Sequence, residues 1–212
     1  QIGIDTIDNG LGYHIYAKVL NTKDYGVPQN RERIFLVGFK EPRDFNFPKK
    51  MELKLRLKDL LEADVDDKYY LSDKMIEGFK KGSWGHNYKP KEGNSIANCL
   101  DTKEGNRRTN NYISHSLYPR SSNTGKGGSG HLSKSDGTSY CVDTGCSQGV
   151  EYKKKIRRLT PLECWRLQGF TNEQFYKAQK VNSDTQLYKQ AGNSITVNVL
   201  VELFKKIYLC KN

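Results

Sequence analysis

The sequence predicts an α/β fold in which part of a larger sheet is joined to a smaller, loop-rich module of mostly β-structure. Two apolar, strand-like runs occupy residues 13–20 and 33–39. Residues 157–212 contain a helix-capping signal and a later run of apolar residues at helical spacing. Between these parts, residues 61–156 are rich in Gly, Ser, Asn and Lys and show weak apolar periodicity.

The first strand-like run alternates apolar and polar residues, as a half-buried strand does, and the second is more fully apolar. The connection Asp24–Pro28 contains a glycine and a proline, which interrupt regular structure. We therefore expect neighbouring strands at the edge of a larger sheet, with residues 1–60 forming the end of that sheet.

A helix is predicted to begin after Thr160. Thr160 is a typical N-cap residue, Pro161 suits the first helical position, and Glu163 completes a capping box. Gly169 stands where a left-handed C-cap is expected. Glu163 and Arg166 are three residues apart, so we expect them to pair on one helix face.

A closing helix is predicted near the C-terminus and should pack against the sheet. Its apolar positions fall at helical spacing: Val197, Leu200, Leu203, Phe204 and Ile207. Before it stand Gly192, Asn193 and Ser194, of which Asn193 or Ser194 should cap the helix. The free backbone N–H groups there could hold a carboxylate or phosphate, although a plain cap without a ligand fits equally well.

The charge favours a polyanionic partner, because Lys and Arg exceed Asp and Glu to give a net charge of +11. The alternative is that the charge only confers solubility. The five cysteines are odd in number and include no CxxC pair, so we expect reduced thiols, a cytoplasmic location and no metal site. No apolar run approaches the ~20 residues that a membrane span needs. The chain starts at Gln1 rather than Met, and we expect a piece of a longer protein.

Arg31 and Arg33 stand directly before the second apolar run and point to the same side if the chain is extended there. Two guanidinium groups at the mouth of a strand can form a rigid site for an anion or a carbonyl oxygen. The alternative is a solvated, charged turn.

Three segments together resemble the DNA (cytosine-5)-methyltransferase family. Gly26–Ile34 resembles the family's Gln-x-Arg-x-Arg motif. Arg157–Phe170 resembles its Arg-x-Leu-Thr-Pro-x-Glu-x-x-Arg-Leu-Gln-Gly-Phe motif, and Gln190–Ile195 its closing Gly-Asn-Ser-Val motif. Their order around a variable basic segment is also that of the family. The resemblance implies the C-terminal part of a Rossmann-like, S-adenosylmethionine-dependent methyltransferase sheet with a smaller target-recognition domain.

The resemblance also implies roles for individual residues. Arg33 would contact the O2 edge of a flipped cytosine, and Arg31 would support the same pocket or a phosphate. A fixed cation there suits the chemistry, because a thiolate that adds to carbon 6 pushes electron density onto N3 and O2. Asn193 and Ser194 would contact the cofactor S-adenosylmethionine. Cys164, on the capped helix, is expected to pack rather than to react.

Residues 61–156 match the position of the family's target-recognition domain, whose partner is double-stranded DNA. We expect Lys126 and Gly127 to lie in a loop near backbone phosphates. Two recognition loops, Ser135-Asp136-Gly137 and Thr144–Gly149, are expected around a short strand at Ser139–Val142. Asp136 and Gln148 are candidate base readers by hydrogen-bonding type. The alternative for each residue is an ordinary surface turn.

The family's Pro-Cys nucleophile is absent, because none of the five cysteines follows a proline. We therefore expect an N-terminal catalytic half, in the same polypeptide or in a separate subunit, and an inactive chain without it. Residues 157–185 would be a helix and hinge, and residues 186–212 would return to the catalytic domain. Two alternatives stay open: an RNA cytosine-5 methyltransferase, and a DNA-binding subunit or specificity module without chemistry of its own.

Overall fold

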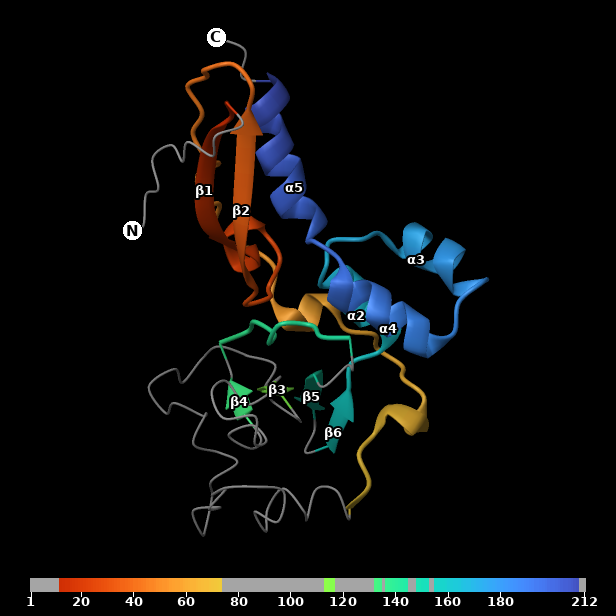
Figure 1. Ribbon diagram of the computed structural model, residues 1–212. Helices are drawn as coiled ribbons and strands as arrows, with labels where there is room; N and C mark the ends of the chain where they lie inside the picture. The colour runs from red at the N-terminus through yellow and green to blue at the C-terminus, as the bar shows by residue number, and fades with distance from the viewer. Residues whose placement is uncertain are drawn as a thin grey trace, which may run out of the picture.

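The computed structural model describes residues 12–73, 113–116, 132–134, 136–144, 148–152 and 155–209. A long β-hairpin with one helix beside it forms one end of the molecule, and a small sheet forms the other (Figure 1). The described helices within residues 161–193 lie beside the junction of these two parts (Figure 1). The predictions for Lys126, Gly127 and Ser135 fall outside the described residues.

The hairpin consists of β1 (His14–Asn21) and β2 (Glu32–Phe39), paired antiparallel with Val19 opposite Ile34. The connection begins with a 3₁₀ turn, Thr22–Tyr25, which ends at Gly26 with φ of 84°. A left-handed conformation of this kind is one that glycine adopts without strain. The prediction of two neighbouring strands is confirmed.

The closing helix α5 (Val197–Phe204) runs along one face of the hairpin and continues into a π-helical turn, Lys205–Leu209 (Figure 1). Its buried Val199 packs with residues of β1 and of the 3₁₀ turn, and its buried Leu203 packs with residues of β2 and of the segment that follows. The prediction that this helix packs against a sheet is confirmed. The apolar contact area excludes water from one face of the hairpin.

The predicted cap of this helix is wrong. Asn193 is the last residue of a preceding helix, α4 (Asp184–Asn193), and Ser194 is its C-cap. Thr196 occupies the N-cap position of α5 without a side-chain capping bond. The Ser194 amide donates to Gln190 and Ala191 carbonyls, so it is not the free N–H group that was expected.

Two other helices complete this region, α2 (Pro161–Arg166) and α3 (Asn172–Gln179). The capping box at Thr160 is confirmed, and so is the positive φ of Gly169, at 80°. The sequence interpretation missed α3 and α4, although Thr171 and Ser183 each cap their helix three residues before a glutamine. That spacing is the signal that would have predicted both helices.

The predicted pair of Glu163 with Arg166 is wrong. Glu163 forms a buried ion pair with Arg157, at 2.7 Å. Arg166 instead donates to the Asn172 side chain and to the Leu60 carbonyl, both at 2.9 Å. Burial explains the choice, because a carboxylate removed from water needs a partner that is itself buried.

The small sheet is antiparallel and has the order β4 (Leu132–Lys134), β3 (Ile113–Ser116), β5 (Gln148–Tyr152), β6 (Lys155–Arg158). The prediction of a short strand at Ser139–Val142 is wrong, because these residues form no strand. This segment is extended, but it makes one isolated parallel bridge, between Ser139 and Gln29.

Among the described residues, the largest apolar core joins the middle of the chain to the helices. Leu57, Val142 and Val150 pack there with Leu159 and with apolar residues of α2, α3 and α4. The extended segment that contains Val142 is therefore held from several sides at once. None of the described helices has the length and apolar character needed to span a bilayer.

Candidate functional site

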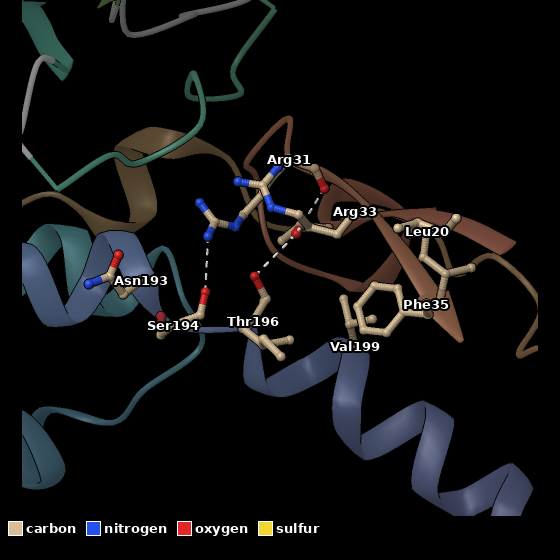
Figure 2. A pocket seen from close by; sticks show the side chains of 11 residues that line it. Leu20, Arg31, Arg33, Phe35, Asn193, Ser194, Thr196 and Val199 are labelled. Atoms are coloured by element: carbon tan, nitrogen blue, oxygen red, sulfur yellow. Dashed lines mark hydrogen bonds between the residues drawn. The ribbon is translucent and has the colours of Figure 1, made fainter. Parts of the chain in front are cut away.

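A cavity of about 210 Å³ opens where β1 ends, β2 begins, and the linker from α4 enters α5. Figure 2 shows the labelled side chains around it. The lining residues are Leu20, Thr22, Arg31, Arg33, Ile34, Phe35, Asn193, Ser194, Ile195, Thr196 and Val199. The structure thus brings together two pairs of residues that lie about 160 positions apart in the sequence: Arg31 with Arg33, and Asn193 with Ser194.

Arg31 is buried, with 6% of its surface exposed. Its guanidinium group donates to three backbone carbonyls: those of Val142 at 2.9 Å, Gly192 at 2.9 Å and Ser194 at 3.0 Å. It also lies 3.0 Å from the Cys141 sulfur. A guanidinium group presents five donors in a planar fork, and most of them are engaged here. Arg31 therefore binds protein segments together, and its predicted contact with a phosphate finds no support in this geometry.

Arg33, by contrast, is exposed at the mouth of the cavity. Nη1 donates to the carbonyl of Glu32 at 2.6 Å, and Nη2 lies 3.7 Å from the Cys141 sulfur. Among the ion pairs between described residues, none includes Arg33. Its charge can therefore act on a ligand that enters the cavity.

A buried polar network lies at the floor of the cavity. The Thr196 hydroxyl donates to Gln168 Oε1 at 3.0 Å and lies 3.1 Å from the Thr22 hydroxyl. Gln168 is fully buried, and its Nε2 atom has no hydrogen-bond partner among the described residues. This network joins the end of β1, the turn after α2 and the start of α5, and so sets the shape of the floor.

Gln29 is a further structural residue that the sequence interpretation did not single out. It is fully buried; its Nε2 donates to the Leu167 carbonyl, and its Oε1 accepts from the Val142 amide at 3.1 Å. It therefore holds the start of the two-arginine segment against the turn after α2 and against the extended segment. Its place in the same motif as both arginines was the available signal.

The predicted recognition residues fall into two groups. Asp136 is exposed, and its carboxylate accepts from the Thr138 amide at 2.9 Å and from the Thr138 hydroxyl, which shapes a turn. Gly137 in this turn has φ of 76° and lies against Arg56. Burial, and secondarily the charge of Asp136, raises the pKa of Tyr140, which keeps its phenol neutral.

Gln148 differs, because it is buried, with 2% of its surface exposed. Its amide donates to the Cys141 carbonyl at 2.7 Å and to the Asp143 carboxylate at 3.2 Å. This burial contradicts the prediction that Gln148 reads a base. Gln148 instead closes the loop between the extended segment and β5.

Similarity to known proteins decides the family of this chain. The model of the C-5 cytosine-specific DNA methylases matches residues 4–209. The chain belongs to this family. As a cytosine-5 DNA methylase family member, it is 35% identical over 199 residues to the type II methyltransferase M2.ScrFI of Lactococcus lactis subsp. cremoris, covering 93% of this chain and 46% of the relative.

A further relative agrees with this methylase assignment, and a solved structure agrees with the fold. The orphan methyltransferase M.SPBetaI of Bacillus phage SPbeta is 32% identical, over 94% of this chain and 59% of its own length. The crystal structure of S. pombe Dnmt2 methyltransferase superimposes with a TM-score of 0.55 at 17% identity, covering 92% of this chain and 58% of that one. That likeness supports the methyltransferase fold. The chain spans about half the length of the relatives it matches.

Proposed function

We propose that this chain is the C-terminal portion of a DNA (cytosine-5)-methyltransferase, supplying target recognition and part of the cytosine and S-adenosylmethionine sites. The observation that carries the proposal is the shared cavity, in which Arg33 lies with Asn193 and Ser194 (Figure 2). The complete enzyme transfers a methyl group to carbon 5 of a cytosine flipped out of the duplex.

Arg33 stabilises the reacting base. A thiolate that adds to carbon 6 of cytosine moves an electron pair toward N3 and O2, and a fixed cation beside O2 lowers the energy of that charge. Arg33 suits this role because it is exposed at the cavity mouth and forms no ion pair with the described residues. The Pro-Cys nucleophile belongs to the other half of the enzyme, since no cysteine of this chain follows a proline.

Asn193 and Ser194 are the proposed cofactor contacts in this chain. Asn193 is exposed and Ser194 half-buried, and both line the cavity beside apolar residues such as Phe35 and Val199. An amide and a hydroxyl beside an apolar wall suit a ligand that carries both polar and aliphatic parts. S-adenosylmethionine supplies the methyl group when bound, and this chain holds part of it in place.

Target recognition is assigned to residues 61–156. In the described part of this segment, Asp136 is exposed in a turn whose Gly137 lies against Arg56. Lys126, Gly127 and Ser135 stay predictions for the same surface. The net charge of +11 supports binding to the phosphates of double-stranded DNA.

The hairpin supports the proposal that a further half of the enzyme docks on this chain. On the face of the hairpin opposite α5, Val19, Ile34 and Leu36 are 58%, 62% and 65% exposed. Strands that are apolar on both faces are typical of sheets covered on both sides. We propose that the catalytic half, contained in the greater length of the relatives, covers this face as a preceding segment or a separate chain.

Replacing Leu36 with aspartate is expected to prevent this docking, because it places a charge in the centre of an apolar contact. If the halves are separate chains, co-purification should fall at least about tenfold, in line with the several kcal/mol that an unpaired buried charge costs. Val181→Asp is the matched control, because Val181 is 82% exposed on the distant α3–α4 connection. If the halves are one polypeptide, the melting temperatures of Leu36→Asp and Val181→Asp are compared instead. Equal behaviour of both variants would contradict the docking face.

Methyl transfer by the complete enzyme tests the proposed function. The enzyme is incubated with labelled S-adenosylmethionine and either duplex DNA or a folded RNA, and the modified nucleoside is identified. We expect 5-methylcytosine in DNA. Product in RNA alone would favour the RNA methyltransferase, and DNA binding without product would favour a specificity module.

A further inference from the structure

We infer that Arg31 and Gly192 form a junction that couples the target-recognition segment to the cofactor turn, so that binding of DNA and of cofactor reinforce each other. This inference rests on the proposed function and adds a regulatory link within it. The recognition segment is defined here as residues 136–144, and the cofactor turn as residues 192–196. Both residues are positioning residues, because each acts through the backbone that it holds.

The first observation is how the Arg31 bonds are distributed. One guanidinium nitrogen, Nη1, donates to the Val142 carbonyl of the recognition segment at 2.9 Å. The other, Nη2, donates to the Gly192 and Ser194 carbonyls of the cofactor turn, at 2.9 and 3.0 Å. A single buried cation therefore joins both segments to the strand that carries Arg33. Figure 2 shows its bond to Ser194 of the cofactor turn. Bonds from a charged donor to buried carbonyls are among the stronger ones in proteins.

The second observation is independent of Arg31. A Cβ atom on Gly192 would lie 2.4 Å from the Thr144 nitrogen, 2.5 Å from the Asp143 carbonyl carbon and 2.8 Å from its oxygen. The last turn of α4 thus rests directly on the backbone of the recognition segment, with no side chain between them. Gly192 lies within a helix, so its backbone conformation does not require glycine. Glycine is needed there because the close approach of the two backbones leaves no room for a Cβ atom.

These two contacts make the segments one mechanical unit. A shift of the recognition segment would strain the Arg31 bond to Val142 or press on Gly192, and in either case favour a movement of Ser194. Because packed backbone has few alternative arrangements, such a shift is transmitted rather than absorbed. Linkage then requires that DNA bound at one segment and cofactor bound at the other change each other's affinity by the same factor.

The test measures, in the complete enzyme, the factor by which bound DNA changes the affinity for the cofactor. The dissociation constant of S-adenosylhomocysteine, a non-reacting analogue of the cofactor, is determined by calorimetry without DNA and with saturating duplex DNA that the enzyme methylates. We expect DNA to tighten analogue binding at least about fivefold in the wild type. In Arg31→Lys and in Gly192→Ala the factor should fall toward one, because lysine lacks the fork and alanine separates the two backbones.

Arg43→Lys is the matched control, because Arg43 is exposed at the far end of the hairpin, and it should keep the wild-type factor. Thermal melting shows whether Arg31→Lys or Gly192→Ala fails to fold. If one of them does, the coupling factor of the other variant tests the junction. A wild-type factor of one, or variants that keep the wild-type factor, would overturn the junction while methyl transfer continues. An enzyme that methylates no cytosine would refute the proposed function, and the junction with it.

Discussion

Replacing Arg33 with alanine lowers the rate of methyl transfer, kcat, by about 10²–10³-fold, the loss expected when one preorganised donor to a developing negative charge is removed. Arg33 is exposed and lines the cavity, so its loss removes a charge at the reacting base without emptying a packed core. KM for DNA should change less than kcat, because the interaction is strongest in the transition state. Single-turnover measurement with duplex DNA checks this expectation.

Two controls make the result specific. Arg43→Ala removes an exposed arginine that follows the hairpin and does not line the cavity, and it should leave kcat near the wild-type value. Cys141→Ser removes the thiol beside both arginines, at 3.0 and 3.7 Å, and should also retain activity, since the nucleophile is assigned to the other half. Abolished transfer in Cys141→Ser, with Arg33→Ala fully active, would reverse the assignment.

Replacing Glu163 with glutamine is expected to lower the free energy of unfolding by about 3–5 kcal/mol, because it leaves a buried arginine without its counter-charge. The side chains of Arg157 and Glu163 are 6% and 0% exposed and joined by two hydrogen bonds, at 2.7 and 2.8 Å. Burial alone would lower the pKa of Arg157, but the bonds and charge of Glu163 outweigh it, and the pKa is raised. Glu163 also accepts from the Thr160 and Glu62 amides, so the pair anchors three segments.

Chemical denaturation, followed by tryptophan fluorescence, measures this loss. Glu173→Gln is the matched control, because Glu173 forms an ion pair of the same 2.7 Å length with Lys177, but both side chains are more than 70% exposed. An exposed pair of this kind contributes about 0–1 kcal/mol, so this variant should unfold close to the wild type. Equal losses in the two variants would show that burial does not decide the strength of the pair.

Local sequence signals predicted the elements that depend on neighbouring residues. The alternation and apolar character of residues 13–20 and 33–39 predicted the hairpin, and Thr160 with Glu163 predicted the start of α2. These signals work because a strand's side-chain period and a helix cap involve atoms within a few positions of one another. The first and the last of the three family motifs likewise predicted that Arg33 meets Asn193 and Ser194 at one cavity, although not how every residue there is used.

The sequence by itself determined the family, the hairpin, the capped helix and the meeting of Arg33 with Asn193 and Ser194. Only the tertiary structure decided that Arg31 holds three carbonyls, that Glu163 pairs with Arg157, and that Gln148 is buried. The physical reason is that a polar side chain takes its partner from whatever burial brings beside it. Val142, Gly192 and Ser194 are more than a hundred residues from Arg31, a separation that no local pattern encodes.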